Sequence, residues 1–207
     1  DIRKSLFYLR TTTDIRTLMR TLALLLVLGG TFVSLLSIYA HDHPSAHHSS
    51  TIFSRLYAAV GVGHLLGSLL GVYFAEYSKQ KAAFVVYLIF GLCLAALSAL
   101  LASSYWEIAL SIILIGLFSS VCIHLLKGLI QSHVEPDMYG RIAGFTQLLT
   151  GVSSLFASGA GFVIHYLSNG GLHPYAAFEY VQMGMFGLLA LLTLVNLPSL
   201  RRVQYSI

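Results

Sequence analysis

Charge is scarce in this sequence. Only 10% of its 207 residues are Asp, Glu, Lys or Arg, whereas 57% are hydrophobic and the mean hydropathy is +0.79. A water-soluble domain needs about a quarter of its residues charged to cover its surface. The shortage therefore excludes an ordinary soluble domain and favours a protein whose surface lies in lipid.

Cysteine and acidic residues are scarce as well. Cys93 and Cys122 lie inside apolar stretches, which excludes a disulfide framework or a CxxC metal site and favours two small core residues. No Asp or Glu lies inside the long uncharged stretches, so no carboxylate pair is available there for acid–base catalysis. The HExxH, GxSxG and phosphate-binding glycine motifs are also absent. We therefore expect no enzyme, no resident metal and no cofactor.

Six uncharged stretches separate the charged residues. Each has the 17–25 residues that cross a hydrocarbon core of about 30 Å, and only a helix satisfies its own backbone polar groups in lipid. The predicted fold class is an all-α membrane protein. We expect six transmembrane helices in a bundle over residues 21–200, at approximately 21–40, 56–75, 82–105, 108–130, 142–165 and 179–200.

The Lys and Arg residues predict the orientation. With the N-terminus inside, only Arg55 lies outside, a strong asymmetry under the positive-inside rule. Both chain ends are then cytoplasmic in a plasma membrane, taken as a bacterial inner membrane. Because the basic residues border apolar stretches, they indicate membrane lipid and not nucleic acid as the partner. The inside residues are Arg3, Lys4, Arg10, Arg16, Arg20, Lys79, Lys81, Lys127, Arg141, Arg201 and Arg202.

The two ends of the chain lie outside the bundle. Residues 1–20 alternate apolar and basic residues at roughly helical spacing, which indicates either an amphipathic lead-in helix on the cytoplasmic surface or a solvated linker with some helix. Residues 201–207 form a cytoplasmic tail. The first residue is Asp1, from which we expect the chain to be part of a longer protein.

Small residues in the second and fifth spans indicate close helix packing. GxxxG spacing lets two helix backbones approach in lipid, where packing drives association. The glycines expected at such contacts are Gly63, Gly67, Gly71, Gly159 and Gly161.

Polar side chains recur on single faces of several spans. A polar stripe facing lipid is disfavoured, so each stripe should face other helices or a wet cavity. Interhelical hydrogen bonding and a substrate pathway both explain this pattern, and for His64, near the middle of its span, a neutral imidazole bonded to a neighbouring helix is one interpretation. The candidate pathway residues are His64, Ser68, Ser120, His124, Gln147, Thr150 and Ser154.

Two further features carry alternative interpretations. Lys127 either binds an anionic group near the cytoplasmic mouth or extends to the inner interface. The outer loop of residues 41–48, HDHPSAHH, either binds a transition metal or is simply solvated, and Pro44 disfavours a helix that would pair His43 with His47.

Two inner loops carry a family resemblance. The glycine-rich second span is followed by EYSKQK at residues 76–81, and the fourth by VEPD at 134–137 and Gly140-Arg141. With six short-looped spans, these motifs resemble the major facilitator superfamily, in its drug/macrolide or siderophore exporter branch. The resemblance covers nearly the whole chain and implies the C-terminal half of a transporter, built of two inverted three-helix repeats. The gating-loop candidates are Glu76, Lys79, Lys81, Gly140 and Arg141.

The resemblance also implies a function. It favours alternating-access transport, as proton-coupled export (antiport) of a small amphipathic or siderophore-like molecule, with an N-terminal six-helix half absent from this chain as partner. A six-helix scaffold or assembly module, or a metal-ion carrier, is the alternative. A six-span half encoded upstream would favour the transporter over the scaffold, and metal-dependent uptake would favour the carrier.

Overall fold

The computed structural model describes Tyr8, residues 11–42, 49–77, 81–102 and 104–169, together with Met183, Gly184, Gly187 and Leu191. All regular structure in this part of the chain is helical, which confirms the all-α prediction there. The elements are α2 (Thr13–Asp42), α3 (Ser49–Tyr77), α4 (Lys81–Leu101), α5 (Tyr105–His133), the short 3-10 helix η2 (Pro136–Met138) and α6 (Tyr139–Asn169).

Most helices extend beyond the predicted spans. The expected bounds followed charged residues, but a helix need not end where the hydrocarbon ends, and Arg16, Arg20 and Arg55 all lie within helices. The exception is α4, which ends at Leu101 instead of residue 105, because Ser104 already caps the next helix. Residues 13–20 of the expected lead-in are continuous with the first span, and Ile15 and Leu18 there are fully buried.

The junctions around α5 follow from local sequence. Ser104 Oγ accepts a hydrogen bond from Glu107 N at 3.3 Å, and Glu107 accepts one from Ser104 N at 3.1 Å. This reciprocal capping box satisfies free N–H groups at the start of α5. At the other end the chain becomes extended at Val134, and Pro136 begins η2, where its missing N–H costs little. The two ends of α5 are therefore defined by sequence.

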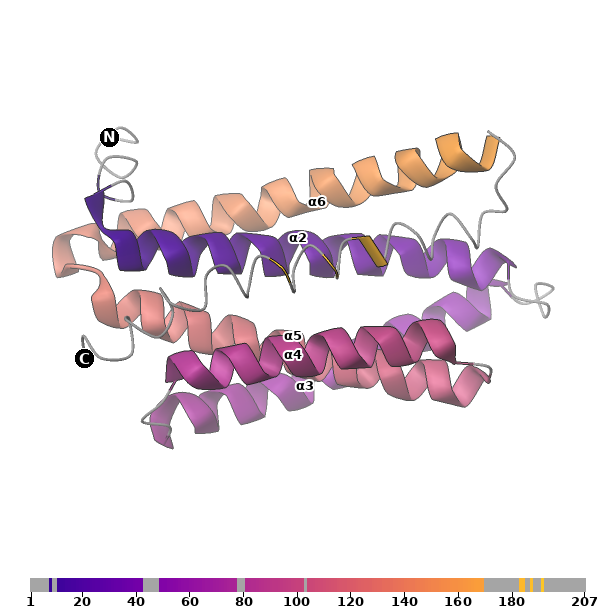
Figure 1. The fold of residues 1–207 in the computed structure, drawn as a ribbon, viewed down its shortest axis with the longest axis horizontal. Helices are drawn as coiled ribbons and strands as arrows, with labels where there is room; N and C mark the ends of the chain where they lie inside the picture. The colour runs from indigo at the N-terminus through magenta and orange to yellow at the C-terminus, as the bar shows by residue number, and fades with distance from the viewer. Residues whose placement is uncertain are drawn as a thin grey trace.

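The central element is α5, which packs against α2, α3 and α4. It lies parallel to α3, and antiparallel to α4, whose Ser98 Oγ is 2.9 Å from Ser111 Oγ of α5. On the opposite side α6 lies alongside α2 and starts at the same end of the molecule (Figure 1). The ends of α3 and α5 and the starts of α2, α4 and α6 therefore meet at one end of the bundle.

Helix length and composition indicate a membrane protein. In the described residues three helices are long and apolar enough to cross a bilayer, over Thr13–Phe32, Thr51–Glu76 and Tyr105–His133, and Ala83–Ala99 is a shorter apolar helix. The 29 residues of α5 extend about 43 Å at 1.5 Å per residue, more than a hydrocarbon core. The six-span count stays a prediction, because most of the expected sixth span, 179–200, lies outside the described residues.

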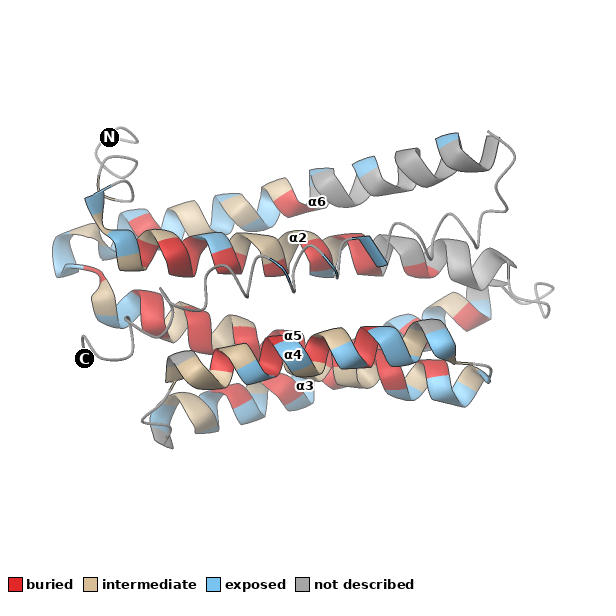
Figure 2. Ribbon diagram, viewed as in Figure 1, coloured by how far each residue is buried: buried red, intermediate tan, exposed pale blue. Residues whose placement is uncertain are grey.

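Burial differs sharply between the helices. Within the segment of α5 that is apolar enough to cross a bilayer, 61% is buried inside the protein. The corresponding segment of α3 is only 22% buried. Figure 2 shows buried positions along α5 and many exposed positions on α3. The exposed residues of α3 are largely apolar, including Leu65 and Leu69. This face suits contact with lipid or with another apolar helix.

Candidate functional site

Glycines of α3 bring its backbone against α5. A Cβ added at Gly63 would clash with the carbonyl oxygen of Ile113 and lie 3.1 Å from the Cα of Gly116. At Gly67 the added Cβ would lie 2.8 Å from Ser120 Cβ, and at Gly71 it would lie 2.9 Å from His124 Cβ. Only glycine permits this approach, so the three-glycine seam sets the separation of the two helices.

The close approach brings polar groups of the two helices together. Ser68 Oγ lies 3.0 Å from Ser120 Oγ and 3.2 Å from His124 Nε2. The carbonyl oxygen of His64 accepts from Ser68 Oγ at 2.8 Å and lies 3.1 Å from Ser120 Oγ. Four of the seven candidate pathway residues therefore meet in one cluster, which we call the serine–histidine cluster (Ser68, Ser120, His124 and the His64 carbonyl).

Proton counting restricts how this cluster is bonded. Each hydroxyl has one proton, and a carbonyl oxygen can accept two hydrogen bonds. If both serines donate to the His64 carbonyl, neither proton remains for the other serine, and His124 donates its Nε2–H to Ser68 Oγ. The two hydroxyl protons, the His64 carbonyl and the His124 Nε2–H are then all bonded inside the protein.

The imidazole of His64 lies outside this cluster. The residue is exposed on α3, and it borders a small cavity where α2, α3, α4 and α5 meet. That cavity has about 20 Å³, enough for about one water molecule. Ser119 is its other polar neighbour, and the remaining walls include Leu25, Phe32 and Leu92. His64 thus contributes its carbonyl to the helix contact and also borders a separate, nearly apolar space.

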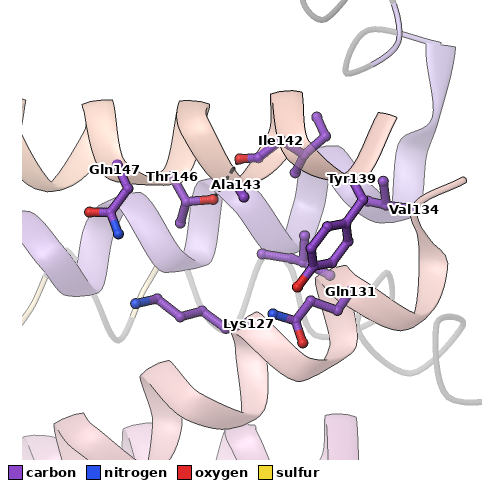
Figure 3. A pocket seen from close by; sticks show the side chains of 9 residues that line it. Lys127, Gln131, Val134, Tyr139, Ile142, Ala143, Thr146 and Gln147 are labelled. Carbon is purple, nitrogen blue, oxygen red and sulfur yellow. Dashed lines mark hydrogen bonds between the residues drawn. The ribbon is translucent and has the colours of Figure 1, made fainter. Parts of the chain in front are cut away.

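A larger cavity lies between the end of α5 and the start of α6 (Figure 3). Its volume is about 240 Å³. We call it the α5–α6 cavity. The lining residues are Lys127, Ile130, Gln131, Val134, Tyr139, Ile142, Ala143, Thr146 and Gln147.

The α5–α6 cavity combines a cation with neutral polar groups. Lys127 is half-buried, and its side chain extends from α5 toward Gln147 of α6 (Figure 3). The Tyr139 side chain points toward Gln131. Thr146 donates its hydroxyl proton to the carbonyl of Ile142 at 2.7 Å. None of the lining residues is acidic. Chemically, the cavity can hold a polar or negatively charged group of a small molecule against apolar walls.

The polar stripe of α6 continues from this cavity along an exposed face. Gln147 and Thr150 are exposed, and the Thr150 hydroxyl donates to the carbonyl of Thr146 within the same helix, at 3.1 Å. Added Cβ atoms at Gly144 and Gly151 would meet nothing within 4 Å. The Ser154 side chain lies outside the described residues. The described part of the chain therefore leaves a polar, glycine-containing face of α6 uncovered.

The remaining predicted residues are not gathered into one site. Glu76 is exposed at the end of α3 and Lys81 begins α4, while Lys79 lies outside the described residues. Gly140 and Arg141 are exposed at the start of α6. The two groups occupy different junctions at the same end of the bundle (Figure 1). Nothing lies within 4 Å of a Cβ added at Gly159, and the surroundings of Gly161 are not described.

Several residues of the site were missed from sequence. Gln131 follows Lys127 by one helical turn, a spacing that could have identified it. Tyr139 and Thr146 gave no such signal, because their place depends on how α6 packs. Tyr8 was also missed: its hydroxyl accepts a hydrogen bond from Glu135 N at 3.3 Å and ties the start of the chain to the α5–α6 junction.

No cluster of three metal-binding side chains occurs among the described residues. Residues 43–48 of the histidine-rich loop lie outside that part of the chain. Comparisons with protein-family models, curated proteins and solved structures gave no match. The functional argument therefore depends on the geometry of the α5–α6 cavity and the polar face beside it.

Proposed function

We propose that this chain forms one half of a solute transporter that works by alternating access, with the α5–α6 cavity on the solute pathway. The cavity itself carries this proposal. Lys127 and Gln131 of α5, a helix long and apolar enough to cross a bilayer, line unfilled space together with Gln147 of α6. Ionisable residues in membrane helices are costly and usually mark substrate or ion pathways. A purely structural scaffold would favour tightly packed helices, whereas this site leaves a cavity of about 240 Å³.

The uncovered face of α6 supports a second bundle opposite this one. Gln147 and Thr150 are exposed there beside Gly144 and Gly151. A polar face at membrane depth is unfavourable against lipid. A water-filled pathway between this bundle and an N-terminal six-helix half accounts for the exposure, as in transporters whose solute site lies between two halves.

The family resemblance supplies the more specific form of the proposal. In a major facilitator-type transporter these helices correspond to the seventh to twelfth, in a bacterial inner membrane. The reaction is then export of a small amphipathic or siderophore-like molecule in exchange for protons. Coupling acids lie in the other half, and Glu76, Lys81 and Arg141 at the cytoplasmic end contact it during gating.

Transport by inside-out vesicles tests the proposal. In vesicles from cells expressing this chain together with its N-terminal six-helix half, a pH gradient should drive uptake of a catecholate siderophore or a fluorescent amphipathic amine above empty-vector vesicles. Gln147→Leu should lower the initial rate about tenfold, the cost of one lost polar contact of about 1.4 kcal/mol. Leu148→Ala, at the adjacent exposed apolar position, should retain the rate.

Two results would count against the proposal. The first is uptake of both solutes at the empty-vector level with the protein present in the membrane. The second is an equal rate for Gln147→Leu and the unsubstituted protein, which would remove the α5–α6 cavity from the pathway.

A further inference from the structure

We propose that the α5–α6 cavity binds an oxyanion, a carboxylate or phosphate group, through Lys127. The inference deepens the proposed function, on which it rests for the role of the bound group as the acidic end of a transported solute. The binding itself requires only the cavity and its lining residues.

The charge of the cavity walls points to an anion. Lys127 is the only charged residue among those that line it, and no carboxylate lines it. A lysine in a membrane helix is costly, most of all at the centre and less near the end, where Lys127 lies. An oxyanion in the cavity would offset this cost, since charge-assisted hydrogen bonds are the stronger kind.

Neutral donors line the same cavity as Lys127. Gln131 and Gln147 each carry an amide NH₂, and Tyr139 a hydroxyl, that can donate to a ligand in the cavity, and Gln147 lies on the side toward which Lys127 extends (Figure 3). Thr146 already donates its proton to Ile142 O, so it offers only an acceptor. Within the described part of the chain, no hydrogen bond or ion pair involves the side chains of Lys127, Gln131, Tyr139 and Gln147.

The apolar walls restrict the class of ligand further. Ile130, Val134 and Ile142 line the same space as Lys127. At about 240 Å³ the cavity is smaller than the 300–1,000 Å³ usual for drug-sized ligands. It accommodates one small aromatic or aliphatic acid, or the acidic end of a larger molecule. An anionic lipid headgroup offers the same oxyanion chemistry.

Calorimetric titration of the full chain in phosphatidylcholine nanodiscs tests whether the cavity binds a small soluble acid. The probe is 2,3-dihydroxybenzoate, and catechol is its neutral counterpart. Lys127→Gln should weaken binding of the acid at least about tenfold, whereas Lys127→Arg should stay within about threefold of the unsubstituted protein. Arg20→Gln removes an exposed basic residue outside the cavity and should leave the affinity unchanged. Catechol should bind far more weakly than the acid.

Native mass spectrometry distinguishes the lipid source. If the acid does not bind, co-purified phosphatidylglycerol retained by the unsubstituted protein and by Lys127→Arg, but lost from Lys127→Gln, would identify a lipid headgroup as the oxyanion. The inference is overturned if neither ligand distinguishes Lys127→Gln from the unsubstituted protein, or if catechol binds as tightly as the acid. Because binding is measured without transport, failure of transport alone would overturn only the proposed function.

Discussion

At the scale of single residues, two glycines of α3 show how closely packing is specified. Gly61 and Gly63 lie two positions apart, yet an added Cβ meets nothing within 4 Å at Gly61 and clashes with the Ile113 carbonyl at Gly63. Both glycines carry the same backbone entropy cost in a helix. The difference between them is therefore the contact with α5, which gives a matched pair for substitution.

Gly63→Ala should destabilise the protein by about 1–3 kcal/mol, the usual cost of overpacking, because the Ile113 backbone cannot move independently of α5. Gly61→Ala should be neutral or stabilising by up to about 1 kcal/mol, since alanine is the better helix former. Thermal unfolding in detergent, followed by Trp106 fluorescence, measures both. Equal midpoints for the two variants would show that α3 and α5 do not pack in this register.

At the scale of helices, the glycine seam and the serine–histidine cluster are two parts of one contact. The seam brings the backbones of α3 and α5 so close that the Oγ atoms of Ser68 and Ser120 lie 3.0 Å apart. Both hydroxyls also reach the His64 carbonyl. In lipid such interhelical hydrogen bonds contribute modestly, about 0.6 kcal/mol on average. The cluster therefore adds specificity of register to a contact held mainly by packing.

A double-mutant cycle measures that contribution. Ser68→Ala and Ser120→Ala should show a coupling energy of about 0.5–1.5 kcal/mol, because both hydroxyls donate to the His64 carbonyl and their oxygens lie 3.0 Å apart. Thr150 supplies the control, since its hydroxyl bonds only within α6. The pair Ser68→Ala and Thr150→Ala should be additive within about 0.3–0.5 kcal/mol. Additivity of both pairs would contradict the cluster.

Sequence predicted the presence of these helices better than their limits. The uncharged stretches of the sequence predicted the apolar central parts of α3 and α5. They did not predict the helix ends, which depend on backbone hydrogen bonding and on caps such as Ser104. The small-residue spacing identified the glycines of α3. It could not identify Gly116 as the partner of Gly63, because α5 has no matching GxxxG repeat and register is a tertiary property.

The candidate site was predictable only in part for the same reason. Helical spacing placed Ser120 and His124 on one face of α5, and Gln147 and Thr150 on one face of α6. Spacing alone could not show which of these residues belong to the serine–histidine cluster and which to the α5–α6 cavity. That division depends on how α6 packs against α2. The cavity-lining Tyr139 lies in a junction where no periodic pattern exists.

At the scale of the whole molecule, the helix directions and the distribution of basic residues are consistent with one orientation in the membrane. The end of α3, the start of α4 and the α5–α6 junction lie at one end of the bundle, together with Arg16, Arg20, Lys81 and Arg141 (Figure 1). The start of α5 lies at the other end, where Trp106 is 79% exposed. The positive-inside rule predicts that the basic end is cytoplasmic, and an exposed Trp at the opposite end would suit the outer membrane interface.

Single cysteines test this orientation directly. With Cys93 and Cys122 replaced by alanine, Trp106→Cys should react with a membrane-impermeant maleimide on intact cells. Glu76→Cys and Arg141→Cys should react only after permeabilisation, because the parallel arrangement of α3 and α5 places both junctions on the same side. Labelling of Glu76→Cys and Arg141→Cys from opposite sides would exclude this arrangement. The α5–α6 cavity would then open to a different compartment from the α3–α4 loop, and joint gating by the two would be impossible.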